Sequence, residues 1–406
     1  MGSYSFFLFL HLGNHRVRSG NCILWLLTAI GRNAVLCMAQ EKKCRSMNKY
    51  SVDPDITVAE TLPAIFYRDQ EVFDAMRAGI FTHSWHWLGD APTLLPLDRY
   101  AYPLSLLDGY LEEPMVLVSD GDGVIRCMSN VCTHRANLVV HNPGKINNLT
   151  CMYHGRRWDM DGTFKFMPEF NEAKGFPRPC DHLHSFPLEQ WGPWLFTGLA
   201  PEVDFSMIRS YLDQWVGFLP LHEFKLDPIK NRDYLVNCHW SLYCDNYLEG
   251  FHIPFVHPDL NAALDYDAYT TELFDYGTLQ IGFADGAEEV FDLPADHPVA
   301  GRHVAAFYFW IFPNIMLNFY PWGLSVNVVK PLSIKKTKVS FITYMYDSSK
   351  YETYSVDAID KTEREDEFVV EGVSRGLQSR FYKSGRFSPK REQGVHHFHR
   401  MLADRV

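Results

Sequence analysis

Two cysteine and histidine pairs stand close together in the first half of the chain. The first pair is Cys132-x-His134, and the second, Cys151-x-x-His154, follows on what must be a separate loop. Thiolate sulfur and imidazole nitrogen are the side-chain donors that suit transition metals best. Because each pair supplies one donor of each kind, the stretch predicts a metal site that both loops share.

The grouping of these donors distinguishes two kinds of metal site. A zinc finger usually places its two cysteines first and its two histidines second. Here cysteine and histidine alternate, which favours a two-iron cluster with both thiolates on one iron and both imidazoles on the other, as in Rieske centres. Neutral imidazoles in place of two thiolates make such a cluster less negative, so its reduction potential rises. Structural zinc is the alternative interpretation.

A second group of donors follows about one hundred residues further along the chain. His252 and His257 stand five residues apart in DNYLEGFHIPFVHPDL, with Pro254 between them. This spacing is poor on a regular helix, but a helix that ends near the proline can turn both imidazoles inward. Two histidines and one carboxylate on one face of an iron ion would leave other positions open for dioxygen. Taken alone, two neighbouring histidines are more often structural.

Together, the two motifs resemble the large (α) subunit of the Rieske non-haem iron oxygenases over roughly residues 50–406. The resemblance implies that Cys132 and Cys151 hold one iron of a [2Fe–2S] Rieske cluster and that His134 and His154 hold the other. It also implies an all-β Rieske domain and, after it, a catalytic domain of the α+β class. In that domain an antiparallel sheet is flanked by helices, an arrangement known as helix-grip or START-like.

The same resemblance implies a mononuclear Fe(II) site. The family signature Asn-Tyr-x-Glu/Asp-x-x-His-x4-His makes His252 and His257 two of the ligands and places Asn246 near the iron. The third ligand is a carboxylate of the C-terminal helix, and alignment of REDEFVVEGVSRGL with the family pattern selects Asp366. An acidic run on a helix is usually a solvated face, so three neighbours remain alternatives: Glu363, Glu365 and Glu367.

Glu249 precedes His252 by three residues, which is one turn if the segment is helical. At this place the family has an acidic residue that joins the two metal centres through hydrogen bonds to one histidine of each. A carboxylate in that position fixes the orientation and tautomer of the ligand histidines. The resemblance also implies a homotrimer, in which the cluster of one subunit supplies electrons to the iron of the next. The alternative for Glu249 is a surface position on the helix.

The chemistry that the resemblance implies is reductive activation of dioxygen, with hydroxylation or oxidative demethylation of a small organic substrate. The chain has neither a glycine-rich dinucleotide motif nor the cysteine spacing of plant-type ferredoxins. A separate reductase, with NAD(P)H as the electron source, is therefore the expected partner. Three hypotheses compete: an aromatic-ring-hydroxylating dioxygenase α subunit, an electron-transfer Rieske protein without oxygenase chemistry, and a zinc-stabilised binding module.

Two segments bear on the class of substrate: the aromatic stretch of residues 307–329 and the C-terminal segment GLQSRFYKSGRFSPKREQGVHHFHRML. Both resemble most the branch that contains choline monooxygenase, glycine betaine demethylase and carnitine oxygenase. Aromatic faces attract a trimethylammonium group through cation–π interaction, although strands favour aromatic residues for packing alone. The candidates for substrate contact are Trp310, Phe319 and Trp322, with Phe312 and Tyr320 beside them. The C-terminal histidines His396, His397 and His399 are interpreted as packing or interface residues.

The elements that must position these sites change in type along the chain. Residues 67–80 have the spacing of a helix with one apolar face, within a helical lead-in of residues 47–82. Residues 83–205 contain short strand patterns and Asp-Gly turns, which predict the Rieske domain. Residues 206–406 form the catalytic domain. There we expect a helix that ends near Pro254, three strands within 303–346 and a long C-terminal amphipathic helix.

Composition limits the remaining questions. The 406 residues are 47% apolar, enough for a large core and two or three domains. The net charge of −11 does not indicate nucleic acid or a membrane as partner. Nine cysteines, an odd number, argue against a secreted disulfide framework and for a reducing, cytoplasmic location. The seven cysteines outside the metal motif are interpreted as packing residues, among them Cys127, Cys180, Cys238 and Cys244.

The first 46 residues differ from the rest, since they hold six basic residues and one acidic residue. Their apolar run from Cys22 to Ile30 is too short to span a bilayer, which takes about 20 residues. We expect a disordered tail or a start codon placed ahead of Met47. An organelle-targeting segment is the alternative, because such segments are rich in arginine and poor in acids.

Overall fold

The computed structural model describes residues 50–284, 286, 289–351 and 356–406. The N-terminal extension 1–46, and with it the expectation of a tail or targeting segment, lies outside the described residues. The same holds for three of the cysteines interpreted as packing residues: Cys22, Cys37 and Cys44. In the described part of the chain, every helix is too short or too polar to cross a bilayer.

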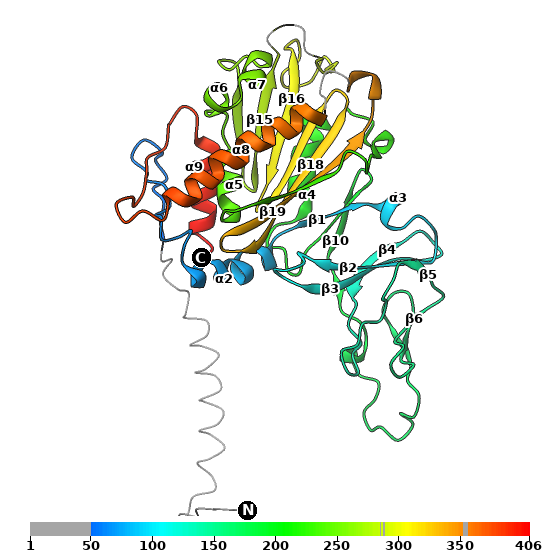
Figure 1. The fold of residues 1–406 in the computed structure, drawn as a ribbon. Helices are drawn as coiled ribbons and strands as arrows, with labels where there is room; N and C mark the ends of the chain where they lie inside the picture. Colours follow the sequence, from blue (N-terminus) through cyan, green and yellow to red (C-terminus); the bar gives the residue numbers. More distant parts are fainter. Residues whose placement is uncertain (1–49, 285, 287–288, 352–355) are drawn as a thin grey trace, which may run out of the picture. The chain divides into compact units, whose positions relative to one another are not determined.

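A helix and an all-β module make up the first half of the described chain (Figure 1). Helix α2 (Gln70–Gly79) buries Val72, Phe73 and Met76, as its sequence pattern predicts. The module contains a five-stranded sheet, β5-β2-β3-β4-β9, and two three-stranded sheets, β1-β11-β10 and β6-β7-β8. Its elements are β1 His86–Asp90, α3 Ala91–Leu94, β2 Tyr100–Leu106, β3 Glu113–Ser119, β4 Ile125–Ser129, β5 Gly144–Lys145, β6 Leu149–Thr150, β7 Arg157–Trp158, β8 Phe164–Phe166, β9 Ser185–Phe186, β10 Leu188–Trp191 and β11 Trp194–Thr197.

Two hairpins of this module follow the turn residues in the sequence. Strands β3 and β4 pair antiparallel on either side of the Asp-Gly turn, and β7 and β8 pair on either side of Asp161-Gly162. Gly162 has a φ of +83°, where a side chain would be strained, and an added Cβ would lie 2.7 Å from the sulfur of Met128. The loops that carry the cysteine and histidine pairs are therefore attached to short, rigid strands.

The second half contains an antiparallel eight-stranded sheet and the helices that cover it (Figure 1). Its order is β12-β19-β18-β17-β16-β15-β14, with β13 also paired to β19. Its elements are α4 Phe205–Val216, β12 Lys225–Leu226, β13 Arg232–Val236, α5 Trp240–Tyr247, α6 Ile253–Val256, α7 Pro258–Ala263, β14 Thr270–Phe274, β15 Gly277–Phe283, β16 Val304–Ile311, β17 Ile315–Tyr320, β18 Gly323–Ser333, β19 Lys336–Met345, α8 Val356–Gly376 and α9 Gln393–Ala403.

The sequence pattern underestimated this sheet. The three strands expected within 303–346 correspond to β16, β18 and β19, and the pattern missed β17 between them. Only three residues, Phe312, Pro313 and Asn314, separate β16 from β17, so the connection between the two strands is short. The long C-terminal amphipathic helix is confirmed as α8.

The helix expected to end near Pro254 ends earlier. Helix α5 stops at Tyr247, and the short helix α6 begins after a turn. Pro254 lies in the first turn of α6, where a backbone N–H would have no helical partner. The turn is held by the carboxylate of Glu249, which accepts hydrogen bonds from the N–H groups of Phe251 and His252. Glu249 therefore stands in a turn and not on a helix.

The aromatic residues of the large sheet divide between its two faces. The antiparallel register pairs Trp310 with Met316 and Phe307 with Phe319, so Trp310 and Phe319 point in opposite directions. Trp310 lies against Phe398 of α9, with 4.9 Å between ring centroids. On the other face, Phe319 lies 6.1 Å from Trp191 of β10. One cage cannot contain both rings.

Trp310, Phe319 and Trp322 also have no accessible surface, with relative exposures of 0%. In this structure the three rings are covered by protein, as the alternative interpretation of a sheet core expects. Their contact with substrate stays a prediction.

We expect Phe319→Ala to lower the free energy of unfolding by about 3–5 kcal/mol, because the large cavity left behind cannot close. Leu273→Ala, on the exposed part of β14, should lower it by less than about 1 kcal/mol. Denaturant unfolding of the two variants measures both values. Equal losses would show that Phe319 is not part of the core.

Candidate metal centres

Two tight loops of the same design present the first set of donors. In the first loop, the N–H of Cys132 donates to the oxygen of Asn137 at 2.8 Å, and the N–H of Ala136 donates to the oxygen of Cys132 at 2.9 Å. In the second loop, Cys151 donates to Arg156 at 2.9 Å and Gly155 donates to Cys151 at 3.0 Å. Each cysteine is therefore fixed at the closing point of its own loop.

The thiols and the imidazoles of these loops occupy different depths. Cys132 and Cys151 are buried, whereas His134 and His154 are partly accessible. The two imidazole rings lie side by side, with 4.8 Å between centroids. The Nδ1 atom of His134 is buried and has no hydrogen-bond partner among the described residues. An unpartnered ring nitrogen next to a second imidazole is what a metal ligand requires.

The arrangement of the four donors is compatible with a two-iron cluster. Each loop contributes one buried thiol and one partly accessible imidazole, so the two thiols can hold one iron and the two imidazoles the other.

A buried ion pair joins the two loops. Arg156 Nη2 lies 2.6 Å from Asp181 Oδ1, and both side chains are at most 5% exposed. The backbone oxygen of Asp181 also accepts a hydrogen bond from the Thr133 hydroxyl at 3.0 Å. Burial alone would raise the pKa of Asp181, but the hydrogen bonds from Arg156 and from the backbone N–H of Arg178, together with the charges of both arginines, hold the pKa below its usual value. Asp181 thus fixes the first loop relative to the second.

Hydrogen-bond donors surround the sulfur of Cys151. Asn137 Nδ2 donates to Cys151 Sγ over 3.6 Å, and the backbone N–H groups of Tyr153 and His154 also point at it. Burial raises the pKa of the Cys151 thiol, yet these donors together bring the pKa below its ordinary value. They stabilise the thiolate, which is the form that binds metal.

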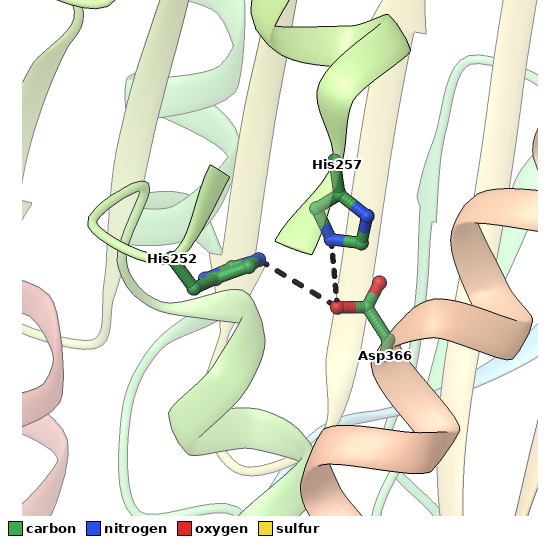
Figure 2. Close-up of side chains that lie close together, drawn as sticks. All are labelled: His252, His257 and Asp366. Atoms are coloured by element: carbon green, nitrogen blue, oxygen red, sulfur yellow. Dashed lines mark hydrogen bonds and ion pairs between the residues drawn. The ribbon is translucent and has the colours of Figure 1, made fainter. Parts of the chain in front are cut away.

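The second set of donors converges on a single point (Figure 2). Asp366 Oδ1 lies 3.0 Å from His257 Nε2 and 3.6 Å from His252 Nε2. The two histidines flank α6 at its N- and C-terminal ends, and Asp366 comes from α8. The side chain of His257 is 2% exposed, whereas those of His252 and Asp366 are 17% and 15% exposed. Two imidazoles and one carboxylate around one point match the facial set of a mononuclear iron site.

Two further carboxylates orient these imidazoles. Glu249 Oε1 lies 2.7 Å from His252 Nδ1, and Glu365 Oε2 lies 2.8 Å from His257 Nδ1. Each Nδ1–H therefore donates to a glutamate, which leaves the Nε2 lone pair directed at the metal position. The sequence predicted the contact of Glu249 with His252. It missed the role of Glu365, whose only sequence signal was its place beside Asp366.

The geometry also separates Asp366 from its acidic neighbours. Asn246 Nδ2 donates to Asp366 Oδ1 at 2.6 Å and so holds the carboxylate toward the histidines. Glu363 points elsewhere and accepts a hydrogen bond from the Tyr243 hydroxyl at 2.7 Å. Burial raises the pKa of Glu363 well above its usual value. Glu367 pairs with Arg364 instead, so Asp366 is the acid best placed to be the third ligand.

The three C-terminal histidines and four further cysteines of the described chain make contacts or have burial that can be compared with their expected packing role. His396, His397 and His399 each bond to a neighbouring part of the same chain: to the backbone oxygens of Asp53 and Phe274 and to the carboxylate of Asp245. They serve packing, as expected. Three of the cysteines are buried in the same way, namely Cys127, Cys238 and Cys244. Cys180 is exposed, so its interpretation as a packing residue is wrong.

Two domain families match two successive parts of the chain. Residues 107–187 match the Rieske [2Fe-2S] domain, and residues 221–406 match the catalytic domain of the ring hydroxylating alpha subunit. The chain belongs to the Rieske non-haem iron oxygenases. The order of the two matches, with the cluster domain first, agrees with the order of the all-β module and the large sheet.

Individual Rieske oxygenases are similar over nearly the whole described chain. Choline monooxygenase from Beta vulgaris is 27% identical over 365 residues, which is 86% of this chain and 78% of the relative. The carnitine monooxygenase oxygenase subunit of Escherichia coli is 28% identical over 370 residues, 85% of this chain and 93% of the relative. A solved quaternary ammonium Rieske monooxygenase aligns with a TM-score of 0.70 at 24% identity, covering 87% of this chain and 97% of its own.

We expect Asp366→Ala to lower the iron content from about three to about two atoms per chain, because the variant loses the carboxylate ligand of the single iron but not the cluster. Acid-labile sulfide should stay unchanged. Glu367→Ala is the matched control and should keep all of its iron. If Asp366→Ala keeps the third iron and Glu367→Ala loses it, the carboxylate ligand is Glu367 and not Asp366.

Asn137→Ala should lower the midpoint potential of the cluster. The amide of Asn137 donates a hydrogen bond to the Cys151 sulfur, and this bond stabilises the more negative, reduced cluster more than the oxidised cluster. A hydrogen bond of about 1 kcal/mol corresponds to about 40 mV in a one-electron couple. Asn148→Ala, which removes an amide that bonds to Thr150, is the control. Redox titration followed by EPR gives the potential, and an unchanged value in Asn137→Ala would contradict the role of this amide.

Proposed function

We propose that this protein is the oxygenase component of a system that hydroxylates or oxidatively demethylates a quaternary ammonium compound. The observation that carries the proposal is the convergence of His252, His257 and Asp366 in a chain that also has a complete set of Rieske donors. Relatives named choline monooxygenase and carnitine monooxygenase support the substrate class. An electron-transfer protein would have no use for the second site.

The residues of each centre fit the group that the family binds there. When bound, the [2Fe–2S] cluster stores electrons and the ferrous ion activates dioxygen. We assign the cluster to Cys132, His134, Cys151 and His154, and the ferrous ion to the converging pair of histidines and Asp366. Glu249 and Glu365 keep both imidazoles in the tautomer that leaves Nε2 free.

Electron delivery supports a homotrimer. In Figure 1, β6, which leads into the second Rieske loop, lies far from α6 and α7. The two metal centres of one chain are therefore far apart. His134 and His154 are partly accessible and are able to meet a neighbouring subunit. We infer that Glu249, which already holds His252, bridges to a cluster histidine of that neighbour. A solved relative is described with inter-subunit electron transfer. A separate NAD(P)H-dependent reductase would supply the electrons.

The substrate needs aromatic surface that is accessible near the iron. Tyr247, Tyr269 and Tyr308 meet this requirement better than the buried tryptophans, because all three are only partly buried. Burial and the neighbouring phenols of the other two raise the pKa of Tyr247, so the three lie close together. The ring of Tyr269 packs on Gly250, where an added Cβ would lie 2.9 Å away. We infer that these rings face the ammonium group.

An oxygenase acting on an aromatic ring is the second candidate. The aligned structure of naphthalene 1,2-dioxygenase, with a TM-score of 0.64 and 16% identity over 87% of this chain and 95% of its own, shows a shared fold. The location is proposed to be cytoplasmic, with organelle targeting by residues 1–46 as the alternative; the choline monooxygenases named among the relatives are chloroplastic.

Oxygen uptake by the reconstituted protein with a reductase and NADH distinguishes these functions. We expect uptake that is coupled to product with at least one of choline, glycine betaine and carnitine, and weaker or uncoupled uptake with naphthalene and toluene. Mass spectrometry of the products separates hydroxylation from demethylation. Coupled turnover of an arene alone would favour the dioxygenase, and no uptake with any substrate despite full iron content would contradict both.

Once a substrate is known, Tyr269→Leu should raise its KM about 2- to 30-fold, as the loss of one cation–π contact implies. Tyr269→Phe keeps the aromatic face and should leave KM nearly unchanged. The neutral isostere 3,3-dimethylbutan-1-ol, in place of choline, should bind equally well to both variants. If Leu and Phe variants raise KM alike, the ring of Tyr269 does not face the ammonium group.

A further inference from the structure

Four aromatic rings form a continuous row from β16 to the segment that follows β19. The ring centroids of Tyr308 and Tyr320 are 5.8 Å apart, and those of Tyr320 and Trp322 are 5.1 Å apart. Trp322 in turn lies 4.9 Å from the ring of Tyr351. These distances fall within the range of about 4.5–7 Å that is typical of aromatic pairs. We call these four residues the Tyr/Trp row.

The inner end of the row lies near the mononuclear site. Burial, the phenol of Tyr308 and the carboxylate of Glu249 all raise the pKa of Tyr269. Tyr269 also packs on Gly250, the residue after Glu249. Glu249 Oε1 lies 2.7 Å from Nδ1 of His252, a candidate iron ligand. Tyr269 therefore lies close both to a residue that holds an iron ligand and to the first ring of the row.

The outer end of the row reaches solvent. Trp322 has no accessible surface, whereas Tyr351 is partly accessible and lines a small pocket with Lys230 and Arg232. Lys230 Nζ lies 4.6 Å from the centre of the Tyr351 ring, and Asp227 Oδ2 lies 3.3 Å from the same ammonium group. A positively charged surface next to Tyr351 favours the approach of small anions.

The row contains the two aromatic residue types that undergo one-electron oxidation in proteins. Tyrosine and tryptophan lose an electron far more easily than phenylalanine does. Phenylalanine is the most frequent aromatic residue of this chain, with 29 copies against 21 tyrosines and 10 tryptophans, yet the row contains none. Trp310, which is buried to the same degree, lies instead against the rings of Phe312 and Phe398. The composition of the row therefore suits electron transfer as well as packing.

We propose that the Tyr/Trp row conducts electrons from the surface to the mononuclear site, and so protects this site when oxygen is activated there without substrate. One electron leaves Tyr351 and moves from ring to ring, through Tyr269, to the oxidised iron site. Tyr351 releases its phenolic proton to water and becomes a neutral radical, while every inner ring ends unchanged. A small anionic reductant, with ascorbate as the probe, then returns one electron and one proton to Tyr351. This path rests on oxygen activation at the iron site and not on the identity of the substrate.

The experiment uses the full, metal-loaded chain with its cluster oxidised and no substrate. Hydrogen peroxide replaces dioxygen, because it needs no electrons from the cluster and the oxidised cluster cannot refill the iron site. We expect freeze-quench EPR to show a tyrosyl radical whose signal narrows in protein made with ring-deuterated tyrosine and disappears when ascorbate is added. Asp366→Ala, which lacks the ferrous ion, should form no radical.

Two variants interrupt the row at different points. Tyr351→Phe should lose the radical that ascorbate removes, and its partly accessible position makes the change mild for folding. Trp322→Phe should lose it as well, and peptide mass spectrometry should then find oxidation at Tyr269 and Tyr308 instead of Tyr351. The matched controls are Tyr346→Phe, a partly exposed tyrosine outside the row, and Trp194→Phe, a fully buried tryptophan outside it. Both controls should keep the radical at Tyr351.

The proposal is overturned if the iron is oxidised and no protein radical forms, or if the radical persists unchanged in Tyr351→Phe. Undiminished oxidation of Tyr351 in Trp322→Phe, or a radical in Asp366→Ala, would overturn it too, because either result means that peroxide attacks Tyr351 directly. Coupled turnover of a quaternary ammonium compound is measured separately with substrate present. Failure of that turnover leaves the radical experiment unaffected.

Discussion

The mononuclear centre depends on one helix being held in register against a segment more than one hundred residues earlier. Three side chains between residues 234 and 246 donate hydrogen bonds to carboxylates of α8. They run from Tyr234 to Asp360, from Tyr243 to Glu363 and from Asn246 to Asp366, at 2.9, 2.7 and 2.6 Å. The acceptors are three residues apart and share one face of the helix. A slip of one residue would rotate that face by about 100° and carry Asp366 away from both histidines.

Both metal centres use the same physical solution, in which neighbouring groups fix each donor before a metal binds. At the mononuclear centre, Glu249 and Glu365 set the imidazole tautomers and Asn246 holds Asp366. At the Rieske loops, Asp181 joins the two halves and Asn137 stabilises the Cys151 sulfur. The ordering cost is met during folding, so the ligand atoms stand near their working positions in the free protein. The role of Glu249 is wider, because it also holds the turn that creates the break between α5 and α6.

Sequence reasoning identified what depends on local spacing and failed where packing decides. The cysteine and histidine pairs, the Asp-Gly hairpins and α2 follow from residue type and period alone. Asp366 could be chosen among four acids only by family resemblance, since nothing in an acidic run shows which carboxylate faces another helix. Trp310 and Phe319 show a related limit, because strand residues of odd and even number point to opposite faces and aromatic density does not reveal which face is accessible. Helix α5 ends before the position that Pro254 indicates, because the chain turns at Glu249, whose carboxylate accepts hydrogen bonds from the N–H groups of Phe251 and His252.

The most direct measurement is a single turnover of the fully reduced protein with dioxygen and its substrate, followed by freeze-quench EPR of the Rieske cluster and by product analysis. We expect the cluster signal to disappear at the rate at which product forms in the unmodified protein. In His257→Ala, with the cluster intact, the signal should persist and no product should form. Oxidation of the cluster at the unmodified rate in His257→Ala, or product formation without the ferrous site, would contradict the claim that these two centres work as one.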